Sequence, residues 1–171
     1  MKKILFLLLS CAICLSFSGC VDSDTPQKES INTNSKVEET EQTFGLNESA
    51  VFKDLKFTAV KLEESDGVDF FTPEKGNVFV GVKFEIENIS DEDQNVSTLL
   101  LFEGYVDNVK CSYSISASCA FNEGTLDGSI APGKKLIGWY AIEVPENWGE
   151  IELQVQSDWL SSNSAKFIFR K

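Results

Sequence analysis

Hydrophobic and polar residues alternate most regularly between Asn77 and Asn88, where the sequence reads NVFVGVKFEIEN. Apolar side chains occupy every second position from Val78 to Ile86, and the positions between them carry a mixed set that ends in charged residues. A period of two predicts a β-strand that turns its apolar set toward a core. The charged second set indicates an antiparallel sheet whose other side is largely in water. We therefore expect this stretch to be a central strand of a β-sandwich.

Shorter stretches of the same alternation lie on both sides of this strand. They predict strands near residues 55–59, 96–106, 109–113, 136–145, 151–155 and 165–169. Val60 and Leu62 follow out of phase with Ala59, as a β-bulge would require. Turn-forming Gly, Pro, Asp and Asn separate the stretches, and none of them has a helical period. The predicted fold class is all-β, an antiparallel β-sandwich of about seven strands.

The first 19 residues have the pattern of a signal peptide. Lys2 and Lys3 precede an apolar run over residues 4–17, which is shorter than the roughly 20 residues of a membrane-spanning helix. The run ends in Phe17-Ser18-Gly19-Cys20, which resembles the lipobox of bacterial lipoproteins, with Phe in place of the usual Leu. The resemblance implies that diacylglycerol on Cys20 anchors the mature chain to the extracytoplasmic face of the cell membrane. The alternative is an ordinary signal peptide that leaves Cys20 as a free thiol.

Residues 20–49 differ in composition from the rest of the chain. They are rich in Ser, Thr, Asn, Glu and Gln, and their isolated apolar residues have no period. Such a segment cannot bury enough surface to offset its ordering entropy. We expect a disordered, lipid-anchored tether over residues 20–49 and one folded domain over residues 50–171, a common domain size.

Two short motifs in the second half of the chain resemble a known family. Ala131-Pro132-Gly133-Lys134 forms a predicted turn, and residues 140–145 read YAIEVP in the strand that follows. With the earlier strand ending in Glu87-Asn88 and the acidic turn after it, this order resembles the telokin-like, immunoglobulin-fold domains of uncharacterised Gram-positive lipoproteins and secreted antigens. The resemblance implies an immunoglobulin-like β-sandwich at the cell surface, and it offers no catalytic residues.

The composition narrows the range of functions. The 171 residues include 27 acidic and 15 basic side chains, for a net charge of −12. This acidity opposes nucleic acid and anionic lipid headgroups as partners. Histidine is absent, which excludes His-based catalytic triads and imidazole metal sites. No nucleotide-binding or hydrolase motif occurs, so we expect no enzyme activity and no cofactor.

The acidic turn after the central strand contains a metal candidate. Asp91, Asp93 and Asn95 have the spacing with which an EF-hand calcium loop begins. Val96 then stands where the EF-hand needs Gly, and Phe102 where it needs a bidentate Glu. A solvated turn is the favoured interpretation, and a looser calcium site or a carboxylate-based enzyme domain is kept as an alternative.

Cys111 and Cys119 are the two thiols left in the mature chain once Cys20 is lipidated. An exported protein folds in an oxidising space, so the even number favours a disulfide between them. The alternative is two free thiols that act as small hydrophobes.

Aromatic residues provide the candidates for a binding surface. Trp139 and Ile137 make the second face of their predicted strand as apolar as the first. Either a neighbouring strand or the C-terminal segment covers this face, which we favour, or it is a patch for a protein partner. Phe70 and Phe71, in the loop before the central strand, allow the same two interpretations, and we expect Phe71 to pack inward from a short extra strand. The candidate partner-binding residues are thus Trp139, Ile137 and Phe70.

These patterns favour a membrane-anchored surface lipoprotein whose immunoglobulin-like domain binds an unknown protein or cell-wall partner. An envelope-assembly or structural lipoprotein without a soluble ligand is the main alternative. No oligomeric state follows from the sequence.

Overall fold

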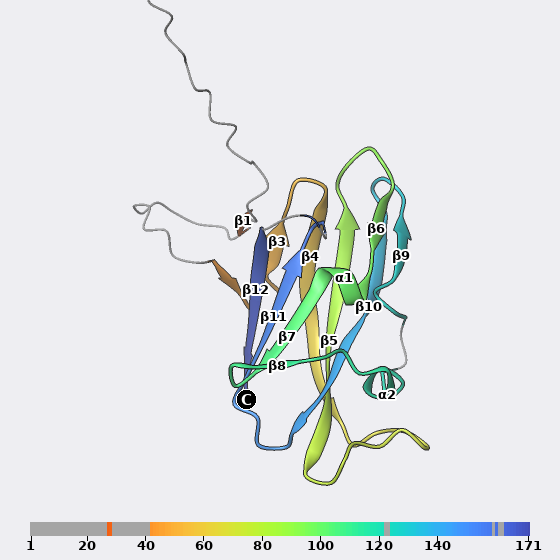
Figure 1. Cartoon of the computed structure of the whole chain (residues 1–171). Helices are drawn as coiled ribbons and strands as arrows, with labels where there is room; N and C mark the ends of the chain where they lie inside the picture. Colours follow the sequence, from red (N-terminus) through yellow and green to blue (C-terminus); the bar gives the residue numbers. More distant parts are fainter. Residues whose placement is uncertain (1–26, 29–41, 122–123, 159, 161–162) are drawn as a thin grey trace, which may run out of the picture.

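The computed structural model describes residues 27–28, 42–121, 124–158, 160 and 163–171 (Figure 1). The predicted signal peptide, the lipid site at Cys20 and most of the predicted tether lie outside these residues. No helix in the described part of the chain is long and apolar enough to cross a membrane.

Two five-stranded sheets pack face to face, which confirms the predicted all-β sandwich. Sheet A has the order β1 (Gln27–Lys28), β3 (Ser49–Val51), β4 (Leu55–Ser65), β5 (Asn77–Asn88) and β10 (Lys135–Pro145). Sheet B has the order β2 (Thr43–Phe44), β12 (Ser164–Arg170), β11 (Glu150–Gln156), β7 (Phe102–Val106) and β8 (Val109–Cys111). A small third sheet pairs β6 (Gln94–Val96) with β9 (Gly128–Ile130). All strand pairs are antiparallel except β2 with β12.

Strand β5 has the predicted bounds and lies in the interior of sheet A between β4 and β10. Its inward-facing side chains are buried, and the Phe84 ring packs edge-on against Phe102 and Phe167 of sheet B at centroid distances of 5.3 and 5.2 Å. The register of β4 against β5 shifts between Ala59 and Lys61, which confirms the predicted bulge. The alternation thus located the strongest core strand and the irregularity beside it.

The folded domain begins before the predicted boundary at residue 50. Phe44 is only 1% exposed, and its ring lies 5.3 Å from that of Phe167. Gln27 and Lys28, inside the predicted tether, pair with Val51 and Ala50. A two-residue strand has no measurable period, so the polar composition around Phe44 concealed its place in the core.

The pattern predicts that the second face of β5 is largely in water, but part of this face is covered. Phe79 on this face is fully buried, because the helical turn α2 (Ile115–Ser118) and the residues after it lie over β5 and β10. A Cβ atom at Gly81 would come within 2.8 Å of the Phe121 ring, so the close approach of this segment requires glycine. Farther along, Lys83, Glu85 and Glu87 are partly exposed, as expected.

The predicted strand over residues 96–106 is divided by a second helical turn. α1 (Thr98–Leu101) separates β6 from β7, so Leu99 and Leu100 turn outward instead of continuing as strand, whereas Leu101 is buried. Asp127 holds this turn in place by accepting hydrogen bonds from the backbone N–H of Thr98 at 2.9 Å and from its hydroxyl at 2.9 Å. A short apolar run fits either helix or strand, and here a contact from a distant residue decides between them.

Candidate functional site

The loop between β4 and β5 projects from one end of the sandwich, seen at the bottom of Figure 1. At its far end, residues 68–71 form a two-residue hairpin turn, which we call the tip. The backbone N–H of Val68 donates to the carbonyl of Phe71 at 2.8 Å, and the N–H of Phe71 donates back at 2.9 Å. Asp69, the first central residue, has a φ of 51°, a conformation that Asp adopts more readily than most residues.

The tip is braced by the residues that lead into it. A Cβ atom at Gly67, whose φ is +101°, would overlap the carbonyl oxygen of Phe71, so the turn requires glycine there. The carboxylate of Glu143 on β10 accepts hydrogen bonds from the backbone N–H of Glu74 at 2.7 Å and from the Asn77 side chain at 2.9 Å. These contacts fix the loop to two neighbouring strands, which lowers the entropy that a partner would have to remove.

Phe70 occupies the second central position of the tip and is 98% exposed. Hairpin turns ordinarily carry Gly, Asn or Asp at such positions, so a fully exposed phenyl ring is not explained by turn chemistry. Phe71 is 42% exposed, and its β-pairing is a single bridge to Val68 across the turn. The expectation that Phe71 packs inward from an extra strand is therefore wrong.

The charge around the tip is negative. Asp66, Asp69 and Glu74 are the acidic residues of the loop, and Lys75 is its single basic residue. An aromatic ring inside a carboxylate rim suits a partner surface with an apolar pocket and basic surroundings.

Trp139, another predicted surface residue, is buried at 5% exposure. Its ring stacks on Phe121 at a centroid distance of 4.9 Å, beneath the α2 segment. The favoured interpretation is right that this face is covered and wrong about the cover, which is the α2 segment instead of a neighbouring strand or the C-terminal segment. This burial removes Trp139 from the candidate binding surface. Ile137, two residues earlier on β10, is 45% exposed.

A groove lies at the opposite end of the sandwich, on one side of α1. It has a volume of about 620 Å³, and its lining includes Lys53, Asp54, Asp93, Asp158 and Leu100. A smaller cavity of about 210 Å³ lies on the other side of α1, against Tyr113 and Tyr140. The leucines between them, Leu99 and Leu100, are 76% and 61% exposed.

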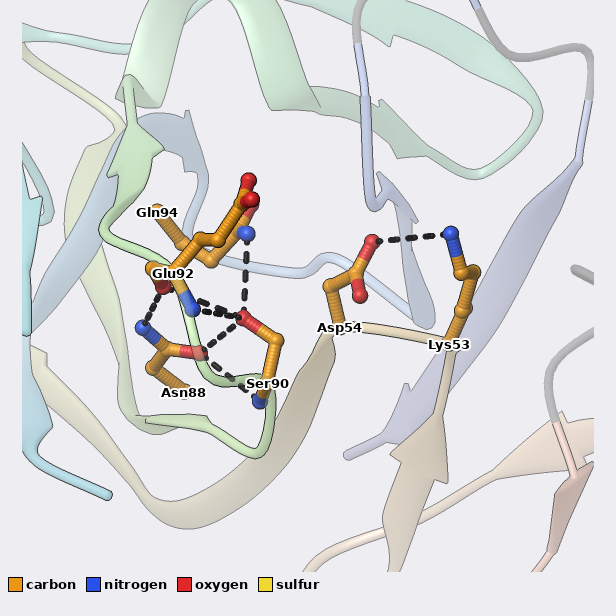
Figure 2. A network of polar contacts seen from close by, with 6 residues as sticks. All are labelled: Lys53, Asp54, Asn88, Ser90, Glu92 and Gln94. Atoms are coloured by element: carbon orange, nitrogen blue, oxygen red, sulfur yellow. Dashed lines mark hydrogen bonds and ion pairs between the residues drawn. The ribbon is translucent and has the colours of Figure 1, made fainter. Parts of the chain in front are cut away.

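One wall of this groove is built on a buried asparagine at the end of β5 (Figure 2). Asn88 is fully buried, and its amide N–H groups donate to the carbonyls of Glu92 and Ile130, both at 2.7 Å. Its side-chain oxygen accepts from the backbone N–H of Ser90 at 2.9 Å and from the Ser90 hydroxyl at 2.8 Å. Gln94 then donates to that hydroxyl oxygen at 3.1 Å. The acidic turn is therefore a hydrogen-bonded structural unit.

The calcium candidates lie on this turn as exposed residues. Asp91, Asp93 and Asn95 have exposed side chains, and Asp93 and Asn95 line the groove. Within the described residues, no group of three His, Cys, Asp or Glu side chains is arranged to hold a metal ion.

Both Cys111 and Cys119 are free thiols in the structure, so the predicted disulfide is not formed. The Cys111 sulfur packs beside Gly104, where an added Cβ would come within 2.9 Å of it, and burial raises the pKa of this thiol to about 11. Cys119 is exposed at the end of α2. The segment between them folds onto β10, where the backbone N–H of Ser114 donates to Ala141 at 2.8 Å, instead of closing a hairpin.

The Glu64 carboxylate serves as a partner in structural contacts. Glu64 accepts from the Trp148 indole N–H at 2.8 Å and lies 2.8 Å from the Lys171 ammonium. The hydrogen bond from Lys171 lowers the pKa of Glu64, which keeps the carboxylate ionised. Contacts of this kind join distant parts of the chain.

Residues 44–166 match the family described as "Domain of unknown function (DUF4352)". Three solved structures share the fold at low sequence identity. A putative lipoprotein (ycdA) of Bacillus subtilis has 14% identity and a TM-score of 0.55, over 68% of this chain and 36% of that one. An uncharacterised β-sandwich protein of Clostridium difficile has 19% identity and a TM-score of 0.52, over 81% and 100%. A conserved hypothetical protein of Bacillus anthracis has 15% identity and a TM-score of 0.51, over 71% and 94%. No curated protein matches the chain.

Proposed function

The chain belongs to the DUF4352 family, and from that premise we propose that it is a lipid-anchored surface lipoprotein whose β-sandwich binds a partner protein through the β4–β5 tip. The 98% exposure of Phe70 on a braced turn is the observation that carries the proposal. Exposed aromatic residues on preorganised loops are typical centres of protein interfaces, because they bury a large apolar area at low entropic cost.

The anchor is the first part of the proposal. Support comes from the lipobox-like sequence at Cys20 and from the fold shared with the Bacillus subtilis protein, which is itself described as a putative lipoprotein. The resemblance of the sequence to telokin-like, immunoglobulin-fold domains of lipoproteins fits the same interpretation.

The arrangement of the strands supports the choice of the tip as the binding end. The short strand β1 follows Cys20 by seven residues and pairs with β3. Near the start of β4 in sheet A, Phe57 pairs with Ala50 of β3 and with Ile86 of β5. The tip emerges beyond the other end of β4, where Ser65 pairs with Phe79. Strand β1 and the tip thus lie at opposite ends of long strands, and an anchor at Cys20 would leave the tip facing away from the membrane (Figure 1).

The test places a photo-crosslinking amino acid at position 70 of the full-length lipoprotein in its native cells. A matched control places it at Ile115, which is 75% exposed on α2. We expect one discrete protein adduct at position 70, absent at position 115, and lost when Asp66, Asp69 and Glu74 are replaced by lysine. Adducts of equal pattern at both positions, or crosslinking to lipid alone, would count against the tip as a protein-binding site.

The anchor has its own test, with an independent outcome. Cys20→Ala should release the protein into the medium or leave an unprocessed precursor. Unchanged membrane attachment of this variant would refute lipidation while leaving the tip proposal to stand on its own experiment.

A further inference from the structure

The outer face of sheet B carries a shallow cavity that the proposed function does not use. Its volume is about 300 Å³, at the lower limit of small-molecule sites. The lining residues are Tyr105, Asn108, Glu150, Glu152 and Gln154. One aromatic ring, two amides and two carboxylates therefore meet on a single sheet face.

The register of sheet B explains why these side chains meet. Tyr105 on β7 is paired with Glu152 on β11, and the alternation of β11 turns Glu150, Glu152 and Gln154 outward while the residues between them are buried. Asn108 comes from the β7–β8 hairpin, where it and Asp107 both have positive φ angles. Strands and a tight hairpin thus position the side chains, so the cavity is largely preformed.

Hydrogen bonds orient the polar groups before any ligand arrives. The Tyr105 hydroxyl donates to the Glu103 carboxylate at 3.1 Å, and this bond raises the pKa of Tyr105, so the phenol stays neutral. The Gln154 amide donates to Glu152 at 2.6 Å, so this amide and this carboxylate are held side by side on the sheet face. Asp107 accepts from the backbone N–H of Glu150 at 2.8 Å and ties the hairpin to β11.

The charge of this face contrasts with that of the whole chain. The charged side chains of its strands are Glu103, Glu150, Glu152, Lys110, Lys166 and Arg170, three of each sign, and the β7–β8 hairpin adds Asp107. Ion pairs join Glu103 to Lys110 at 3.0 Å and Glu150 to Arg170 at 2.6 Å. A nearly neutral face in a chain of net charge −12 fits a neutral ligand better than a strongly charged one.

We propose that this face binds a neutral oligosaccharide, with a sugar ring against Tyr105 and its hydroxyl groups bonded to Asn108, Gln154 and Glu152. A sugar hydroxyl both donates and accepts, so it matches neighbouring amide and carboxylate groups that present both functions. The less polar C–H face of a sugar ring suits the aromatic ring, which offers a flat apolar surface together with a polar hydroxyl.

The test is a calorimetric and NMR titration of the full-length protein with three neutral probes: tetrasaccharides of N-acetylglucosamine, of β-linked glucose and of α-linked glucose. We expect millimolar or tighter binding of at least one probe, with amide shifts confined to β7, β11 and the β7–β8 hairpin. Tyr105→Ala and Gln154→Ala should each weaken it by about tenfold or more, whereas Tyr105→Phe should change it far less. Ile168→Ala, on the same face but outside the lining of the cavity, is the matched control and should leave binding unchanged.

Two results would overturn the proposal. The first is no saturable binding of any of the three probes, and the second is binding that Tyr105→Ala, Gln154→Ala and Ile168→Ala all leave equal. The folded state of each variant is checked by its thermal unfolding, and because two lining residues are tested separately, loss of fold in one leaves the other decisive. Neither result bears on the tip, which lies on another part of the molecule.

Discussion

Replacing Asn88 by alanine tests whether the buried amide at the end of β5 is a main determinant of stability. Asn88 makes four side-chain hydrogen bonds of 2.7 to 2.9 Å, and the carbonyl of Ile130 that it satisfies is itself buried. A buried acceptor left without a partner costs about 1–3 kcal/mol. Each further lost hydrogen bond costs about 0.5–1.5 kcal/mol, and a smaller amount where water replaces the lost partner. We therefore expect Asn88→Ala to lower the free energy of unfolding by about 2–4 kcal/mol.

Urea unfolding followed by tryptophan fluorescence measures this loss. With a slope of about 1–3 kcal/mol per molar urea, the midpoint should move by roughly 1 M or more. Ser90→Ala is the control, because the Ser90 hydroxyl bonds at the exposed side of the same network and its loss should cost under about 1 kcal/mol. Equal losses for Asn88→Ala and Ser90→Ala would refute the reasoning, since burial of the Ile130 carbonyl would then carry no weight.

Three further outcomes follow from packing and burial. Phe44→Ala should lower the free energy of unfolding by about 3–5 kcal/mol in the same assay, and no change would place β2 outside the cooperative fold. Phe84→Ala should cost a similar amount. Lys83→Ala removes an ammonium 5.8 Å from the centre of the Trp139 ring and should cost no more than about 1 kcal/mol. Similar losses for both variants would contradict the assigned faces of β5. Iodoacetamide at pH 8 should alkylate exposed Cys119 well before Cys111, because burial raises the pKa of Cys111 to about 11. Mass spectrometry of a nonreduced digest measures the alkylation of each thiol. A digest in which neither thiol is alkylated would indicate a disulfide.

The sequence predicts the elements whose structure depends on neighbours along the chain. Strict alternation in β5 reproduces its bounds at Asn77 and Asn88, and the phase change after Ala59 marks a real shift of register. These features are local, because inward and outward positions of a strand alternate whatever the partner strand is.

The features that the sequence conceals are set by contacts between distant residues. The turn at α1 depends on Asp127, and the burial of Trp139 depends on Phe121, neither of which a local period reveals. For the candidate site, the pattern identified Phe70 but could not tell exposed from buried aromatics. The sequence does not reveal the cavity at Tyr105, because its residues come from strands and a hairpin that only the register brings together.

The free edges of the two sheets bear on how such a chain behaves when many copies are crowded together. Three of the four outermost strands are very short: β1 and β2 have two residues each and β8 has three. The fourth, β10, has eleven, but the segment before β9 crosses it, with Ser114 bonded to Ala141 and Thr125 packed closely over Gly138. Long unpaired edges are the templates for edge-to-edge aggregation. The short outermost strands cover only part of the strand inside them, since β2 pairs with two residues of β12. The edge that these contacts protect from pairing with another copy at high local concentration is therefore that of β10.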